Sequence, residues 1–193
     1  EGRVFFRPRR DDRPAKFRIS FRTLTQAGGP RILAQVDYAF DGHWLTVAKH
    51  RIKQMTRYQV VAEGEQAQPL KLGKGPFPVP FGQKADDVIE YFRVTTRPVR
   101  EGEPENTDYL KLVTRPAHSE EVRFTQLEMW VDPRTHLPVK LVSRDKSERV
   151  TTVTFENIET GVELTEETFH LPRRLGWQYR VERLEQGPGA EAP

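Results

Sequence analysis

The sequence predicts a mainly β protein of the α+β class, in which a curved antiparallel sheet or an unclosed β-barrel carries a short helix and a proline-rich strap over its concave face. Three patterns support this prediction. Residues 123–169 read as consecutive hairpins, residues 16–22 alternate apolar and polar side chains, and residues 83–93 carry one apolar stripe at helical spacing. Because adjacent hairpins turn one whole face of a sheet toward an interior, function is expected inside the sheet, on its rim or on its outer face.

Strands are expected where alternation is bounded by turn residues, and about nine or ten can be placed. In the first part of the chain they fall at residues 4–7, 16–22, 35–40, 43–50 and 54–62. Asp41-Gly42 is a strong hairpin signal between the third and the fourth of these. In the second part they fall at residues 93–96, 109–114, 123–131, 139–143 and 150–155.

Between these two groups lie the strap and the helix. Proline and glycine recur through residues 64–82 and exclude regular helix there, and residues 76–81 alternate proline with apolar residues. The helix is predicted at residues 83–93. Its stripe predicts that Val88, Ile89 and Phe92 press onto the concave face of the sheet, beside the strap.

Composition limits the function classes. The 193 residues carry 31 Lys and Arg against 28 Asp and Glu, and this small surplus is not typical of a nucleic-acid-binding protein. The chain has no cysteine, which excludes disulfides, thiolate zinc sites and a cysteine nucleophile. No apolar run approaches the ~18 residues of a membrane span. The sequence begins directly with a strand-like segment, so the lack of a signal peptide is not evidence for a cytoplasmic location.

Residues 1–185 are expected to form a single domain, followed by a disordered tail at residues 186–193. Patterns for catalysis or metal binding are missing. The five histidines lie apart, at positions 43, 50, 118, 136 and 170, without the spacing of a zinc site. A basic and aromatic run at residues 5–13 is interrupted by Asp11 and Asp12, which favours a solvated hairpin end over a nucleic-acid surface. The sequence predicts no enzymatic activity, no cofactor, no metal and no nucleic-acid partner.

The order of several motifs resembles one known family. The motifs are Arg13-Pro14 with Phe17-Arg18, Asp41-Gly42 followed by Lys53-Gln54-Met55, the proline-rich segment with the helix at 83–93, Trp130-Val131-Asp132-Pro133 with Leu137-Pro138, and Phe169 with Pro172. Over residues 2–172 the chain resembles the LolA-like outer-membrane lipoprotein carrier and sorting proteins. The N-terminal helix and first strand of that family have no counterpart in this sequence.

The resemblance implies an unclosed barrel capped by helices, with an apolar cavity that holds the acyl chains of lipoproteins in the periplasm. The implied partners are those acyl chains or other lipid, together with envelope proteins. The residues expected to line the cavity are Phe17, Ile19, Phe21, Tyr38, Phe40, Val88, Ile89, Phe92, Leu127, Met129 and Leu141.

Arg13 matches the arginine that this family ties to cargo release. If the strand runs straight through from residue 13, Arg13 shares the face of Phe17 and its side chain points inward. The alternative is that Arg13 is one of four arginines in a solvated turn and points outward with Arg9 and Arg10. The residues themselves leave an alternative open. The same apolar side chains can fill a core, and the protein would then be a β-scaffold or sensor domain for protein contacts in the cell envelope.

Overall fold

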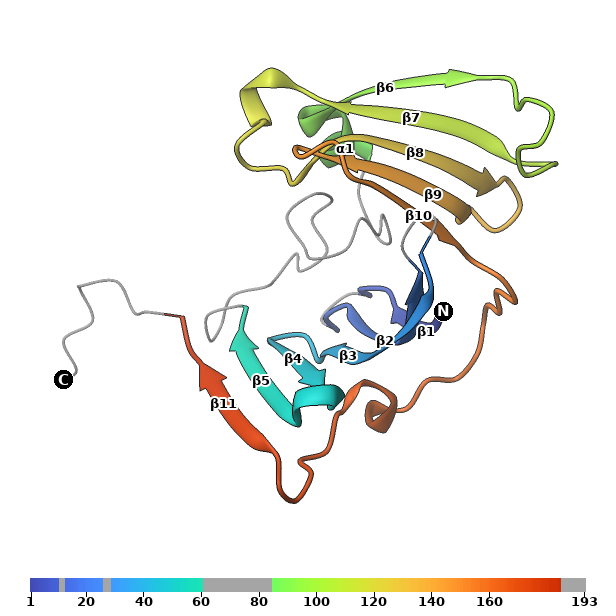
Figure 1. Ribbon diagram of the computed structural model, residues 1–193. Helices are drawn as coiled ribbons and strands as arrows, with labels where there is room; N and C mark the ends of the chain where they lie inside the picture. The colour runs from blue at the N-terminus through green and yellow to red at the C-terminus, as the bar shows by residue number, and fades with distance from the viewer. Residues whose placement is uncertain (11–12, 26–28, 61–84, 185–193) are drawn as a thin grey trace. The chain divides into compact units, whose positions relative to one another are not determined.

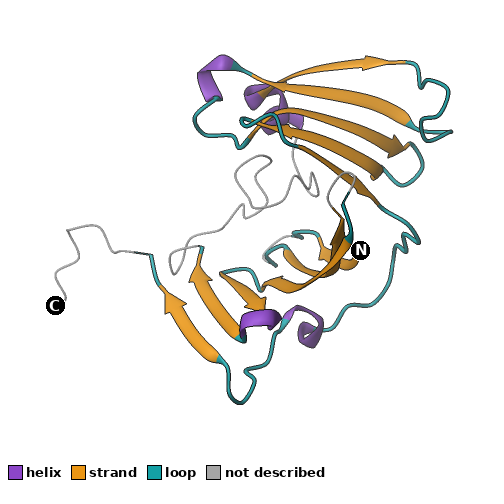
Figure 2. Ribbon diagram, in the orientation of Figure 1, coloured by secondary structure: helices purple, strands orange, loops and turns teal. Residues whose placement is uncertain are grey.

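The computed structural model describes residues 1–10, 13–25, 29–60 and 85–184. It is mainly β, with two curved sheets and one short α-helix, and neither sheet closes into a barrel over these residues (Figures 1 and 2). This confirms the predicted fold class. The chain divides into two compact units, the first made of Glu1–Pro69 and Glu163–Pro193 and the second of Leu70–Val162. The single domain expected over residues 1–185 is therefore seen as two units, each with its own sheet.

The first unit contains a six-stranded sheet in the order β1-β2-β3-β4-β5-β11. The strands are β1 (Gly2–Arg7), β2 (Lys16–Thr25), β3 (Arg31–Phe40), β4 (Trp44–Lys49), β5 (Gln54–Gln59) and β11 (Gln178–Glu182). Two 3-10 turns accompany them, η1 (His50–Ile52) and η3 (Glu166–Phe169). The strands β1 to β5 pair as antiparallel neighbours in chain order, as the hairpin signals predict.

The strand β11 differs from the predicted architecture. It pairs with β5 in parallel, with Gln178 opposite Gln54, whereas the sequence predicts an antiparallel sheet. A parallel neighbour needs a crossover connection, and here the whole second unit lies between the two strands in the chain. The segment is only five residues long, but it alternates polar and apolar side chains from Gln178 to Glu182. The sequence therefore carries a strand signal here that the predicted set of strands does not include.

The turn at Asp41-Gly42 forms the predicted hairpin. The Asp41 carboxylate accepts hydrogen bonds from the backbone N–H groups of His43, at 3.0 Å, and Trp44, at 2.8 Å. Gly42 has φ +111°, and an added Cβ would lie 2.5 Å from Cγ of Pro14. Both the backbone conformation and the close approach therefore require glycine at this position.

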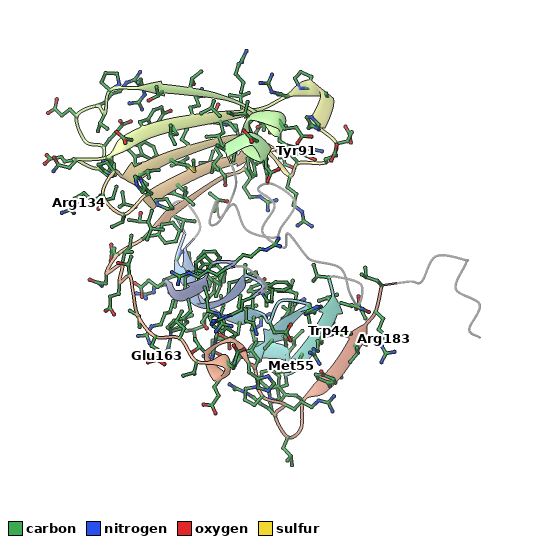
Figure 3. The ribbon with its side chains drawn as sticks, turned by 180° about the vertical axis from the view of Figure 1, so that it is seen from behind. Trp44, Met55, Tyr91, Arg134, Glu163 and Arg183 are labelled. Carbon is green, nitrogen blue, oxygen red and sulfur yellow. The ribbon has the colours of Figure 1, made fainter. Side chains whose placement is uncertain are left out.

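The second unit contains a five-stranded antiparallel sheet in the order β10-β9-β8-β7-β6. Its elements are α1 (Ala85–Tyr91), β6 (Phe92–Arg97), β7 (Asp108–Thr114), η2 (Pro116–His118), β8 (Phe124–Asp132), β9 (Leu137–Asp145) and β10 (Val150–Thr154). The core forms on one face, where Leu112, Leu127 and Leu141 are at most 1% exposed. Val88 and Tyr91 of α1, the latter labelled in Figure 3, pack against this cluster.

The helix is thus placed on the sheet as predicted, but its contacts differ at one position. Val88 packs on the core and Phe92 is 1% exposed, whereas Ile89 is 55% exposed. The prediction that Ile89 presses onto the sheet is wrong. The helix ends at Tyr91, so Phe92 already belongs to β6. The helix residues that face the sheet are therefore Val88 and Tyr91. The predicted strap at residues 76–81 and the predicted disordered tail lie outside the described residues.

Candidate functional site

The two faces of the first sheet follow from its strand register. Phe17 lies opposite Phe40, and Ile19 lies between Val4 on β1 and Tyr38 on β3. Residues that are directly opposite in neighbouring strands point to the same side of a sheet. We call this side the Phe17 face. Its apolar residues are Val4, Phe6, Phe17, Ile19, Phe21, Val36, Tyr38, Phe40, Leu45, Val47 and Tyr58.

The Phe17 face is densely aromatic. The rings of Phe17 and Phe40 stack with centroids 5.6 Å apart, and Phe21 meets Tyr38 edge to face at 6.2 Å. Phe17 and Ile19 are each 4% exposed, while Phe21 and Tyr38 are only half-buried. Burial raises the pKa of the Tyr38 hydroxyl, as expected where the phenolate would be poorly solvated. The centre of the face is therefore dry, and its aromatic margin is partly accessible.

The opposite side, which we call the Met55 face, is covered by a later part of the same chain. Ala39, Ala48 and Met55 are each 2% exposed, and they form a cluster with Leu171. Met55 is labelled in Figure 3. The two alanines leave room for this cover, against which Trp177 and Tyr179 also pack. The Met55 face is thus part of a closed core.

An ion cluster fastens η3 to the same face. The Glu166 carboxylate accepts from Lys16 Nζ and from the Arg7 guanidinium, both at 2.6 Å. These hydrogen bonds lower the pKa of Glu166 to about 2. The Arg7 guanidinium also lies 5.1 Å from the ring centre of Phe169, which is 2% exposed. These ion pairs therefore have a structural role: they hold the edge of the segment that covers the Met55 face.

Three polar residues of this unit resemble a catalytic triad in composition but not in arrangement. Asp37 stands in the middle, with His50 Nε2 at 2.7 Å from its carboxylate and Ser20 hydrogen-bonded to it. Burial opposes the charged form of Asp37, but the bonds from Ser20 and His50 dominate and lower its pKa. A nucleophilic triad needs the histidine between the serine and the carboxylate, so this order anchors a carboxylate and does not activate the hydroxyl.

The residues predicted to line one cavity fall into two separate sets. Phe17, Ile19, Phe21, Tyr38 and Phe40 all lie on the Phe17 face of the first unit. Val88, Phe92, Leu127, Met129 and Leu141 belong to the core cluster of the second unit, and Ile89 is exposed. A role of either set in binding a ligand stays a prediction.

The Arg13 side chain does not point toward the buried face of β2. It is exposed, and its backbone pairs with Arg10 through hydrogen bonds of 3.2 and 2.7 Å at the end of the β1–β2 hairpin. The strand begins only at Lys16, so the parity argument does not extend across Pro14. The prediction of an inward side chain is wrong, and a role in cargo release stays a prediction.

Several members of the Phe17 face are not among the residues predicted to line the cavity. Val36, Leu45, Val47 and Tyr58 join it through the register of β3, β4 and β5. Val47 and Leu45 stand two residues apart, and this alternation is the signal that identifies them. Val36 follows Gln35, whose φ of +43° marks an irregularity in β3.

Within the described part of the chain, no group of three or more His, Asp or Glu side chains is placed to hold a metal ion. The described helices are all too short or too polar to cross a membrane.

No family model and no curated protein matches this chain. Among solved structures, the chain is similar to one described as a proposed outer membrane lipoprotein-sorting protein domain from Vibrio parahaemolyticus. The identity is 15% and the TM-score 0.39, over 82% of this chain and 63% of that one. The chain therefore spans less than two thirds of the length of that structure. A likeness at this level carries no argument about fold or function.

Proposed function

We propose that the protein is a non-catalytic binding or carrier protein for lipoproteins or other acylated amphiphiles, and that it works in the periplasm. The observation that carries the proposal is the Phe17 face, an apolar surface that runs across β1 to β5. The chain covers the Met55 face with its own residues 169–179. The Phe17 face is the one that we assign to the cargo.

The chemistry of such a role requires only burial. Moving an acyl chain from water to an apolar surface gains about 0.8 kcal/mol per buried methylene, and no general acid or base is involved. The half-buried pair of Phe21 and Tyr38 provides an accessible aromatic margin where a chain can enter. The motif resemblance to LolA-like carriers supports the choice of lipoprotein acyl chains and of the periplasm.

A scaffold function is the second candidate, and one observation favours it. Phe17 and Ile19 are each 4% exposed and Phe40 is 1% exposed, as in a filled core. If this packing is permanent, no acyl chain enters, and the protein serves only protein–protein contacts in the cell envelope.

Displacement of a fluorescent fatty acid distinguishes the two functions. The carrier proposal predicts saturable binding at about one site per chain. Tyr38→Glu should weaken it more than tenfold, because a carboxylate would meet the acyl chain. Val181→Glu is the matched control, since Val181 is 47% exposed and its partner Arg57 places it on the opposite face of the sheet.

Circular dichroism of both variants checks that they remain folded. If Tyr38→Glu unfolds the protein, Phe21→Ser on the same margin takes its place. Absence of probe binding by the wild-type protein at high micromolar concentration would refute the carrier proposal and favour the scaffold. Equal loss of binding in Tyr38→Glu and Val181→Glu would show that the Phe17 face is not the site.

A further inference from the structure

One end of the first unit brings together two segments that are distant in the chain. The turn before β11 lies beside η1, since the backbone N–H of Gln178 donates to the carbonyl of Lys53 at 2.9 Å. The His50 ring meets Trp177 edge to face at 5.1 Å, and an Arg174 nitrogen lies 3.4 Å from His50 Nδ1. Figure 1 shows the turn and η1 at the same end of the sheet. We call residues 49–54 and 172–180 the basic end.

The basic end concentrates positive charge. It contains six Lys and Arg residues and no Asp or Glu, although the whole chain carries a net charge of only +3. All six are exposed, and none of them forms an ion pair with a carboxylate in the described part of the chain. They are Lys49, Arg51, Lys53, Arg173, Arg174 and Arg180.

The same end exposes apolar side chains. Leu175 is 104% exposed at the tip of the turn, where Gly176 has φ +76°, and Ile52 of η1 is 56% exposed. One exposed leucine on a protein surface is ordinary. Two exposed aliphatic side chains in segments that also carry six exposed cations form an amphipathic surface.

Two aromatic residues support these side chains. The guanidinium of Arg174 lies 5.2 Å from the ring centre of Trp177, and that of Arg173 lies 3.9 Å from the ring centre of Tyr179. Both rings also pack on the core of the Met55 face, so they tie the turn to the body of the unit. The turn is therefore an anchored projection, with Leu175 at its tip.

We propose that the basic end docks the protein on the surface of an anionic lipid bilayer. The six cations face the lipid phosphates, and Leu175 and Ile52 enter the headgroup region. Segments that bind membrane surfaces combine these features, with Lys and Arg on the polar side and aliphatic or aromatic residues toward the acyl boundary.

The chemistry favours a bilayer over other polyanions. A nucleic acid would pair with the cations but would make no favourable contact with the exposed side chains of Ile52 and Leu175. The rings of Trp177 and Tyr179 each lie against an arginine guanidinium and are therefore not free to stack on bases. A lipid surface accepts charge and aliphatic side chains at the same place. Lys49 and Arg180 lie at the margin of the Phe17 face, opposite Val36 and Thr56. The residues substituted to test the inference, Arg173, Arg174 and Leu175, lie in the turn before β11 and not on that face.

Flotation of the full chain with unilamellar vesicles tests the proposal. Vesicles of phosphatidylcholine containing about 30% phosphatidylglycerol should bind the protein at low salt and release it as salt rises above about 0.1 M. Vesicles of phosphatidylcholine alone should bind it poorly. Joint substitution of Arg173→Gln and Arg174→Gln should lower the partition coefficient about 25-fold, since each cation contributes about fivefold.

Matched variants separate local from general effects. Leu175→Ser should lower partition by about fivefold, whereas Leu33→Ser, at a leucine of the same unit that is 70% exposed, should leave it unchanged. Joint substitution of Arg134→Gln and Arg149→Gln removes the same charge from the second unit and should have little effect. Unchanged circular dichroism and melting temperature establish that each variant is folded.

Three results would overturn the proposal. They are the absence of vesicle binding, equal binding to neutral vesicles, and an unchanged partition in Leu175→Ser combined with equally tight binding to a short DNA duplex. The fatty-acid displacement assay, run on the same variants, should be unaffected. Failure of vesicle binding with intact acyl binding therefore refutes the docking surface alone.

Discussion

The orientation of α1 can be tested with the same substitution at two adjacent positions, Val88→Asp and Ile89→Asp. Val88 packs against the core of the second unit, whereas Ile89 is 55% exposed. Both native residues are β-branched, and both variants add one negative charge to a seven-residue helix. Differences in helix propensity and net charge therefore cancel between the two proteins.

The expected magnitudes differ widely. Full burial of a valine side chain contributes about 1.5–3 kcal/mol, so the half-buried Val88 contributes about 1 kcal/mol. A carboxylate left at the edge of the core adds a desolvation cost of about 1–3 kcal/mol. Val88→Asp should therefore lower the free energy of unfolding by about 2–4 kcal/mol. Ile89→Asp should change it by no more than about 0.5 kcal/mol.

Urea unfolding followed by circular dichroism measures both values, and thermal melting gives a second estimate. For a unit of this size, each kcal/mol corresponds to roughly 4–8 °C in Tm. The helix dipole favours a new carboxylate slightly more at the earlier position, so it acts against the expected order. Greater destabilisation by Ile89→Asp, or equal effects at both positions, would refute the assigned helix orientation.

Two further changes test the first unit. Gly42→Ala should lower its stability by about 2 kcal/mol or more in urea unfolding, because it adds a clash with Pro14 to the strain at positive φ. Gly176→Ala, in the same unit, has φ +76° and open space around it, so it should show the backbone cost alone. Glu166→Gln should cost at most about 1 kcal/mol, since the carboxylate is largely exposed. The folded-state pKa of Glu166 is depressed from 4.5 to about 2, so the difference from wild type should be full above pH 4.5 and should disappear as the pH falls toward 2; a difference that grows on acidification would contradict the pairing with Lys16.

Local sequence patterns predicted most of the strands because alternation and turn chemistry agree along the chain. Residues 16–22 were expected to form a strand, and β2 covers Lys16–Thr25. The expected hairpin at Asp41-Gly42 is present, with the carboxylate satisfying two backbone N–H groups. Each of these signals depends on residues within a few positions of one another, which is the range over which sequence determines backbone conformation.

The features that the sequence did not reveal depend on distant partners. The parallel pairing of β11 joins it to β5, more than a hundred residues earlier in the chain. In the loop after β6, the Arg97 guanidinium lies 3.6 Å from the ring centre of Tyr109 and bonds to Glu103. These bonds lower the pKa of Glu103 to about 2. Neither contact has a local pattern in the sequence.

The candidate site follows the same division between local and distant information. Phe17, Ile19 and Phe21 were assigned to one face because β2 alternates regularly, and the register confirms that Tyr38 and Phe40 join them. The second set was predicted to line the same cavity because one curved sheet was expected for the whole chain. Leu127, Met129 and Leu141 instead form the core of a separate unit. Alternation shows which side of its own sheet a residue lies on, but it does not show to which of the two cores that side belongs.

The asymmetry between the two faces of the first sheet determines which one should be tested for cargo. Among the described residues, those that cover the Met55 face come after position 163, and they contribute Leu171 to the core and β11 to the sheet edge. A chain that ended at residue 162 would therefore lack that cover and expose the side chains of Ala39, Ala48 and Met55. In the full chain this face is occupied by the protein itself, and a ligand would have to displace buried aromatic and aliphatic residues. An acyl chain that enters the first unit is therefore expected on the Phe17 face, where Phe21 and Tyr38 remain partly accessible.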